Sequence, residues 1–383
     1  MENAPKLRFE GFDGEWEKKT LGDISVFFDT MRKPLEGSKR VAGPYPYYGA
    51  SGIVDYVDGY IFEEELVLLS EDGANILDRN YPVCFLATGK YWVNNHAHVL
   101  KAKEGNDNNF ICNSLERKDY KEFNTGMAMP KLNKDVCQGI PVCCPCYEEQ
   151  RLIGNILRNI DHLITLHQRK HDTLLKAKQF YLQNLFPKKG EKVPAIRFAG
   201  FEGEWRWKKL GDVFQEYSEK NHPELPPLTI IQGGGTVLRE KSDRCLQYDK
   251  DSLNGYKVVH KDDFIVHLRS FEGGLEIANS DGIVSPAYHV LHGEGIEPRF
   301  YYPYFRSRQF IDRQLTGFVY GIRDGRSIDI EGMKTIKIPY PSFEEQREIS
   351  SFLNEIDHLL ALQSRKLETL KKMKQFMLQN LFV

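Results

Sequence analysis

The stretch PCYEEQRLIGNILRNIDHLITLHQRKHDTLLKAKQFYLQNLF, residues 145–186, decides the fold because it occurs a second time. Residues 341–382 read PSFEEQREISSFLNEIDHLLALQSRKLETLKKMKQFMLQNLF and are identical to it at 25 of 42 positions. A shorter segment also repeats. PKLRFEGFDGEWEKKTLGDI at 5–24 and PAIRFAGFEGEWRWKKLGDV at 194–213 share 12 of 20 positions. The chain therefore contains two tandem copies of one plan.

The segments between these repeats, 25–144 and 214–340, have diverged beyond easy alignment. The offset between the copies changes from 189 to 196, so the second middle segment is seven residues longer. Similar ends predict a shared scaffold, and dissimilar middles predict recognition of two different targets. Drift after duplication, without a division of function, is the alternative.

Each long repeat predicts a helix. From Glu148 to Phe186, Gly154 is the sole glycine and there is no proline. At about 1.5 Å per residue, such a helix spans roughly 58 Å. Pro187 ends the first helix, and Ser342 with Glu345 predicts a capping box for the second. Apolar residues recur at alternating three and four spacing, as in helices that pair. The expected seams are Ile153, Ile156, Ile160, Leu163, His167, Leu174, Ala177, Tyr181 and Leu185, and Ile349, Phe352, Ile356, Leu359, Gln363, Leu370, Met373, Met377 and Leu381.

The partner of each helix is expected to be the other copy. If a pseudo-twofold axis relates the copies, the helices pack antiparallel and their midpoints bring His167 close to Gln363. Polar residues inside an apolar seam fix its register at a cost in stability. The alternative is that these positions face a separate protein.

The middle segments predict mixed α/β domains. Expected strands include 66–69, 82–87, 91–100, 264–268 and 288–291. In the first domain, the aromatic, amide and imidazole groups of 89–99 and the loop 45–52 suit contacts with base edges. His96 and His98, alternating on one expected strand, could instead hold a metal or be structural. Spacing places no third ligand beside them.

The second domain carries the strongest basic and aromatic cluster in the chain, within 299–326. Arginine suits guanine edges and phosphates, so we expect some of this cluster to contact DNA. A helix over about 300–313 with a solvated basic face is the alternative. The six arginines are Arg299, Arg306, Arg308, Arg313, Arg323 and Arg326.

Composition excludes several classes. The net charge of −2 argues against a general nucleic-acid coat. There is neither a signal-peptide pattern nor an apolar run of about 20 residues, so we expect a cytoplasmic protein. Four of the seven cysteines lie between 137 and 146 without a second cluster, which favours reduced thiols near a buried strand over a zinc site. The sequence contains no GxxxxGK[ST], GxSxG or HExxH motif, and no methyltransferase-like motif, which argues against catalysis.

The layout resembles the specificity (S) subunits of type I restriction–modification systems, the HsdS family. The resemblance covers nearly the whole chain. It is carried by RFxGFxGEW with LGD at 8–23 and 197–212, by PxxEEQR at 145–151 and 341–347, and by the helix ending QNLF. Within the middle segments, YGASG at 48–52, EDGAN at 71–75, NNHAH at 94–98 and GIVSPAY at 282–288 resemble pieces of target recognition domains in this family.

The resemblance implies an α+β fold. Two mixed α/β target recognition domains are joined by two long antiparallel helices that form a pseudo-twofold symmetric coiled coil. The expected divisions are 1–144 for the first recognition domain, 145–189 for the first spacer helix, 190–340 for the second domain and 341–383 for the second spacer helix. Each domain would read one half of a split, asymmetric DNA site, and the helices would set the gap.

The resemblance also implies partners. Two methyltransferase (M) subunits would dock on the helices and use S-adenosylmethionine to methylate adenine. Motor-nuclease (R) subunits would use ATP and Mg. This chain itself would carry no cofactor, metal or catalytic residue and would bind double-stranded DNA. The expected DNA-binding residues are Tyr47, Tyr48, Ser51, Arg79, Lys90, Tyr91, Asn94, Asn95, His96, Arg239, Arg269, Ser270, Tyr320, Arg323 and Arg326.

Two other functions stay open at this point. A free-standing DNA-binding regulator or decoy would bind its site tightly without partners. A coiled-coil adaptor that binds only proteins would show no dependence on DNA sequence.

Overall fold

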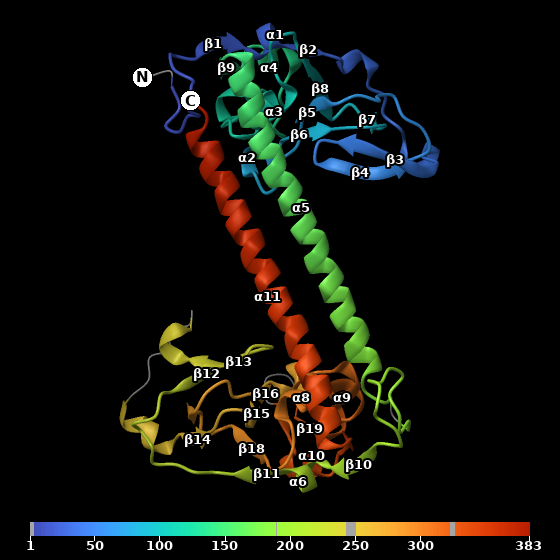
Figure 1. The fold of residues 1–383 in the computed structure, drawn as a ribbon, viewed down its shortest axis with the longest axis vertical. Helices are drawn as coiled ribbons and strands as arrows, with labels where there is room; N and C mark the ends of the chain where they lie inside the picture. The colour runs from blue at the N-terminus through green and yellow to red at the C-terminus, as the bar shows by residue number, and fades with distance from the viewer. Residues whose placement is uncertain (1–3, 189, 243–249, 322–325) are drawn as a thin grey trace. The chain divides into compact units, whose positions relative to one another are not determined.

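The computed structural model describes residues 4–188, 190–242, 250–321 and 326–383 (Figure 1). The chain forms two compact units. One comprises Met1–Lys170 with Gln363–Val383, and the other comprises His171–Leu362. Each long helix therefore contributes part of its length to each unit.

The first unit contains the strands and helices that precede the first long helix, together with the beginning of that helix. In chain order these elements are β1 (Glu17–Thr20), α1 (Leu21–Ile24), β2 (Ser25–Phe27), β3 (Ala42–Gly49), β4 (Gly52–Val57), β5 (Leu66–Ser70), α2 (Asn75–Asp78), β6 (Cys84–Ala87), β7 (Trp92–Val93), β8 (Ala97–Ala102), α3 (Asn108–Glu116), α4 (Lys134–Gln138), β9 (Pro141–Cys144) and α5 (Tyr147–Asn184).

An antiparallel sheet of order β2-β8-β5-β6 is the centre of this unit. Strand β5 is buried on both faces, because Val67 and Leu69 join the core that contains α3 and α5, while Leu66 and Leu68 join a second core. This burial explains its continuous apolar run. A smaller sheet of order β4-β3-β7 and the pair β1–β9 complete the unit.

The second unit repeats this order with other residues. Its elements are β10 (Arg206–Lys209), α6 (Leu210–Val213), β11 (Phe214–Tyr217), β12 (Leu228–Ile231), β13 (Gly235–Leu238), β14 (Lys257–Val259), β15 (Phe264–Val266), α7 (Ser270–Gly273), β16 (Glu276–Ile277), β17 (Gly282–Val284), β18 (His289–Gly293), α8 (Pro298–Phe305), α9 (Arg308–Arg313), β19 (Val319–Tyr320), β20 (Ser327–Ile328), α10 (Ile330–Lys334), β21 (Lys337–Tyr340) and α11 (Phe343–Asn380).

The central sheet of the second unit has the order β11-β18-β15-β16, which is the order of the first sheet, element for element. The pair β10–β21 corresponds to β1–β9, and the hairpin β12–β13 corresponds to β3–β4. The middle segments that no longer align in sequence have therefore kept the topology of the central sheet, although the smaller sheets around it differ. The predicted class, two mixed α/β domains with long helices, is confirmed.

Helices α5 and α11 run antiparallel within each unit. In the first unit, Nζ of Lys374 lies 2.7 Å from a carboxylate oxygen of Asp161. In the second, Nζ of Lys178 lies 2.5 Å from a carboxylate oxygen of Asp357. These two ion pairs are the same pair with the helices exchanged, because the repeat offset of 196 converts one into the other. Equivalent positions of the two repeats therefore make the same contact in both units.

The predicted midpoint contact is confirmed. Nδ1 of His167 lies 2.7 Å from Oε1 of Gln363, and the Gln363 side chain is buried. The predicted seam is wrong at two positions. Leu163 and Met373 are exposed, and the neighbouring Ile164 and Lys374 are partly buried instead. A strict heptad drifts relative to 3.6 residues per turn, so the seam shifts by one residue along such long helices.

The repeated motifs form the joint between each domain and the helices. Arg8 of the RF motif makes two hydrogen bonds to the buried carboxylate of Glu149 in EEQR, at 2.8 and 2.9 Å. Arg197 does the same with Glu345, at 2.7 and 2.8 Å. The predicted capping box is half wrong. The Ser342 hydroxyl accepts from the Glu345 backbone N–H, but the Glu345 side chain turns to Arg197.

The glutamine of EEQR ties the next helix to the same joint. Oε1 of Gln150 accepts from the backbone N–H of Asp107, which is the N-cap of α3, and Nε2 donates to the Pro145 carbonyl. The corresponding Gln346 makes the same two bonds, to Glu297 and to the Pro341 carbonyl. The repeated residues therefore hold the frame of each unit.

Candidate DNA interface

In the first unit, three loops meet at one edge of the central sheet. The edge is formed by the end of β5, the start of β8 and the β3–β4 turn. The Ser70 hydroxyl donates to the Ala50 carbonyl at 2.5 Å, and the Glu71 backbone N–H donates to the His96 carbonyl at 2.9 Å. The Asn94 backbone N–H also donates to the Tyr48 carbonyl at 3.0 Å. The segments YGASG, EDGAN and NNHAH, distant in sequence, thus form one surface, which we call the first edge.

The first edge carries closely paired charges. Nδ1 of His96 lies 2.8 Å from the Asp72 carboxylate, and half of the His96 side chain is exposed. Arg32 lies 2.6 Å from the Glu71 carboxylate and also donates to the Ala97 carbonyl at 2.8 Å. Lys131 approaches the same carboxylate at 3.5 Å. Such a surface offers both donors and acceptors to a polar partner.

His98 is buried under the first edge, whereas His96 lies on its surface. The turn at 94–96 divides the expected strand 91–100 into β7 and β8, so His96 is exposed whereas His98 is buried. The two rings do not point the same way, which corrects the picture of two histidines on one strand face. Among the residues with described placement, no group of three or more His, Cys, Asp or Glu side chains could hold a metal ion.

The His98 ring is held by two acceptors. Nδ1 lies 2.7 Å from the Asp29 carboxylate, and Nε2 lies 2.7 Å from the Leu132 carbonyl. Burial alone would lower the pKa of His98, but the bonds to Asp29 and Cys137 outweigh it and raise the pKa to about 10. Because both ring nitrogens face acceptors, the imidazolium is the form that satisfies them.

The residues expected to bind DNA in the first domain fall into two groups. Four are exposed: Ser51, Lys90, Asn95 and His96. The others are partly or fully buried. Tyr47 accepts from the Leu35 N–H through its hydroxyl, Tyr91 donates to the Glu64 carbonyl, and Asn94 accepts from the His96 N–H. The Tyr48 ring stacks on Phe85, and Arg79 pairs with Glu116 at 3.0 Å.

The second unit has a corresponding edge, formed by the end of β15, helix α7 and the β12–β13 turn. Glu276 is buried and its carboxylate accepts from the backbone N–H groups of Gly233 and Gly235, at 2.7 and 3.1 Å. Tyr302 and Arg306 bind the same carboxylate. One buried acid therefore fixes the hairpin turn to the sheet and to α8.

A second acid gathers arginines at this edge. The Glu272 carboxylate lies 2.8 Å from Arg269 and 3.2 Å from Arg326, and the Arg326 guanidinium lies over the Phe271 ring at 4.3 Å. Arg269 is strongly exposed, as is Tyr320 on β19. Ser270, by contrast, is buried, and its hydroxyl accepts from the His267 N–H. Arg323 lies outside the described residues.

Arg239 lies at the end of the β12–β13 hairpin. Its guanidinium donates to the Tyr256 hydroxyl at 3.3 Å and lies over the same ring at 5.4 Å.

At the edge of the second unit that contains α7, burial and the charges of Arg306 and Arg269 lower the pKa of His267 to about 4. His267 is therefore neutral at neutral pH, and the positive charge of this edge comes from its arginines.

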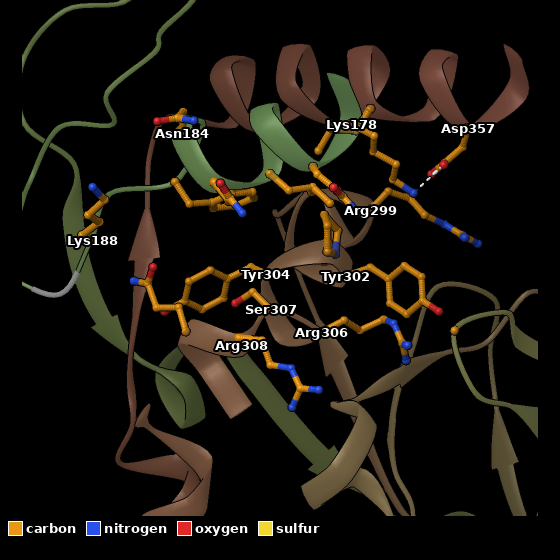
Figure 2. Close-up of a pocket in the computed structure, with 18 of the residues that line it drawn as sticks. Lys178, Asn184, Lys188, Arg299, Tyr302, Tyr304, Arg306, Ser307, Arg308 and Asp357 are labelled. Atoms are coloured by element: carbon orange, nitrogen blue, oxygen red, sulfur yellow. Dashed lines mark hydrogen bonds and ion pairs between the residues drawn. The ribbon is translucent and has the colours of Figure 1, made fainter. Parts of the chain in front are cut away.

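The arginine cluster predicted from 299–326 divides into two places. Arg326 lies at the edge of the second unit that contains α7. A groove of about 1140 Å³ against α5 and α11 is lined by Arg299, Arg306, Arg308 and Arg313. The predicted basic helix is two shorter helices, α8 and α9. Figure 2 shows that the groove is faced by Lys178, Tyr302 and Tyr304. Its lining has six basic and two acidic side chains: Lys178, Lys188, Arg299, Arg306, Arg308 and Arg313 against Asp312 and Asp357.

Sequence reasoning missed several residues of the first edge. Arg32, Asp72 and Lys131 were not among the candidates, although they form its ion pairs. A charged pair directly after the buried run 66–70 was a usable signal for Asp72, because the end of a buried strand delivers such side chains to a sheet edge. Arg32 and Lys131 come from segments with no such pattern.

The fold and its two edges define a class of protein: a duplicated recognition scaffold with one frame and two different surfaces. The family model for the Type I restriction modification DNA specificity domain matches residues 13–176 and 202–372. The chain belongs to the family of type I restriction–modification DNA specificity subunits. Subunits of this family are non-catalytic and carry no cofactor themselves.

Three known proteins illustrate the similarity. A Haemophilus influenzae protein assigned as a type I restriction enzyme specificity subunit is 41% identical over 148 residues, which is 39% of this chain and 37% of that protein. The MjaVIII specificity subunit of Methanocaldococcus jannaschii is 24% identical over 397 residues, covering 94% of this chain and 90% of that protein. The crystal structure of the S subunit of Mycoplasma genitalium covers 99% of both chains with a TM-score of 0.69 at 15% identity, a likeness of fold.

No helix among the described residues combines the length and apolar character that crossing a membrane requires.

Proposed function

We propose that each domain reads one half of a split, asymmetric site on double-stranded DNA, through the major groove. The single observation that carries this proposal is that two sheets of identical strand order present edges of different chemistry. A histidine–aspartate pair and amides occupy the first edge, and arginines around Glu272 occupy the second. A common frame with different edges suits two different half-sites. The domain divisions are 1–144, 145–189, 190–340 and 341–383.

The exposed candidates are assigned to DNA contact. Lys90 and Arg269 suit phosphates or guanine, and Asn95 suits adenine. Ser51, His96, Tyr320 and Arg326 complete the exposed set, and Arg323, which lies outside the described residues, is assigned the same role. The buried or engaged candidates are assigned to holding these side chains in place: Tyr47, Tyr48, Arg79, Tyr91, Asn94, Arg239 and Ser270. The groove of Figure 2 is assigned to phosphates flanking the second half-site, through the arginine and lysine side chains that line it.

The paired helices are assigned two tasks. They set the gap between the half-sites, and they dock two M subunits that use S-adenosylmethionine. Exposed apolar side chains support the docking role because they recur at the repeat offset: Phe180 with Phe376, Leu166 with Leu362, and Tyr147 with Phe343. Repeated exposed apolar surface suits two copies of one partner. R subunits that use ATP and Mg would join this complex in the cytoplasm.

Exchange of one middle segment tests the proposal. The chain is co-expressed with its M subunit, and methylated adenines are mapped across the genome. Replacement of residues 25–144 by the same segment of another family member should change one half of a bipartite motif and leave the other half and the gap unchanged. Unchanged methylation after the exchange would overturn the proposal. Tight, specific DNA binding by the chain alone would favour a free-standing regulator, and binding to M without any dependence on DNA sequence would favour an adaptor.

A further inference from the structure

The most exposed large apolar side chain of the described residues belongs to a loop at the first edge. Met127 is fully exposed, and Met129 is 61% exposed. Neither residue belongs to the core clusters of the unit. Both thioether side chains are therefore accessible to a partner that approaches this loop.

The loop that carries these methionines is tightly constructed. The Asn124 side-chain carbonyl accepts from the backbone N–H groups of Gly126 and Lys131, at 3.0 and 2.8 Å. The Thr125 N–H and hydroxyl both donate to the Lys131 carbonyl, at 2.8 and 3.0 Å. A side chain at Gly126 would place its Cβ against the Met129 carbonyl oxygen, so only glycine fits. The methionines are thus presented by a fixed backbone, which reduces the ordering cost of binding.

The loop is part of the first edge. The Gly73 N–H donates to the Pro130 carbonyl at 3.0 Å, and the Leu132 N–H donates to the Glu71 carbonyl at 2.7 Å. Lys131 adds the ion pair with Glu71. The C-terminal end of the loop that carries the methionines therefore runs beside Asp72, whose carboxylate holds His96.

The second unit uses the same position for other chemistry. In each unit this position lies between a Thr-Gly dipeptide, at 125–126 or 316–317, and the N-cap residue of the next helix. The first unit has the methionine loop there, and the second has the paired strands β19 and β20 with Tyr320 and Arg326. Arg326 pairs with Glu272, just as Lys131 pairs with Glu71, in each case an acid that follows the central strand. One position in the frame thus holds apolar groups in one domain and an aromatic ring with arginine in the other.

We propose that Met127 and Met129 read the C5 methyl group of a thymine in the first half-site. This inference rests on the proposed function and adds two residues to it. In the major groove, the thymine methyl is the apolar feature by which a base pair is distinguished, and a flexible thioether side chain can pack on it. A half-site methylated on adenine contains at least one thymine opposite that adenine, so the ligand is present.

The test uses the full chain in complex with its M subunits and measures binding to a labelled duplex by fluorescence anisotropy. Each thymine of the first half-site is replaced in turn by uracil, which lacks only the methyl group. For the unaltered chain, one replacement should weaken binding about fourfold, the effect of one buried methyl group. M127A and M129A should weaken binding to the normal site, and that uracil should cause no further loss in at least one of them.

Two control variants sharpen the test. Val193→Ala removes another exposed apolar side chain, from the segment between α5 and β10, and should leave binding unchanged. Gly126→Ala keeps both methionines but displaces the loop, and it should reproduce the loss. Thermal unfolding of M127A should match that of the unaltered chain, because Met127 buries nothing. Uracil in the second half-site should weaken the Met127 variant and the unaltered chain equally.

The outcomes separate this inference from the proposed function. If M127A and M129A bind as the unaltered chain does, or both keep the full uracil penalty, the inference is wrong. If, in addition, exchange of residues 25–144 still changes one half of the motif, the proposed function stands. If the complex shows no bipartite preference at all, the proposed function is the one that fails.

Discussion

The ion pair between Arg8 and Glu149 gives the sharpest stability prediction. Glu149 is 1% exposed and Arg8 binds it through both oxygens. Arg8→Ala would leave a buried carboxylate without that partner, and removing one member of a buried pair costs about 3–5 kcal/mol. For a unit of this size, 1 kcal/mol shifts Tm by about 2–4 °C. We therefore expect the Tm of the first unit to fall by roughly 6–20 °C, as measured by differential scanning calorimetry.

The second unit provides a matched comparison. Arg197→Ala removes the equivalent arginine, but Glu345 keeps a hydrogen bond of 3.0 Å from the Trp205 indole N–H, so the loss should lie at the lower end of that range. Replacing both Arg8 and Glu149 by methionine removes the unpaired charge and should recover most of the stability. A Tm for Arg8→Ala within 2 °C of the unaltered chain, or a double variant as unstable as the single one, would refute the reasoning.

Three further predictions concern other contacts. Cysteines at His167 and Gln363 should be joined within one chain by a short bis-maleimide, and failure to form this link would contradict the antiparallel seam. Because the folded pKa of His98 is about 10 against about 6.5 unfolded, its contribution is complete below pH 6.5 and lost as pH rises to 10. Urea unfolding should follow this slope, up to about 1.4 kcal/mol per pH unit, and His98→Gln should flatten it. Gly154→Ala should destabilise by about 1–3 kcal/mol, because the new Cβ would lie 2.7 Å from the Asp107 carboxylate; a gain from better helix propensity would contradict this.

The long helices and their joints to the two domains were predictable from the sequence, because these are the parts that the duplication repeats. The repeated ends predicted the antiparallel helices and even the contact of His167 with Gln363, since a twofold relation determines which residues meet. The exposure of Leu163 was not predictable, because the phase of a long seam depends on small departures from 3.6 residues per turn.

The candidate site was predictable only in part. The segments that meet at the first edge were recognised, but Tyr47, Tyr91 and Asn94 are buried there. Aromatic and amide residues look the same in sequence whether they support a surface or form it. Arg326 and Arg308 are close in sequence and yet belong to different surfaces, because a helix and a hairpin separate them. Tertiary packing, which short patterns do not encode, decides such cases.

The two domains share a frame, but their buried charges are not interchangeable. At the end of α3, Glu116 accepts from the backbone N–H groups of Val83 and Cys84, at the start of β6, and pairs with Arg79. At the end of α8, the corresponding place is taken by Arg306, which pairs with the buried Glu276 of β16. The charge at this helix end is therefore negative in the first domain and positive in the second. If the helix end alone were moved from the second domain into the first, its arginine would face Arg79. Exchange of recognition between such domains therefore requires transfer of the whole middle segment, with the joint of Arg8 and Glu149 left in place, because that joint is common to both copies.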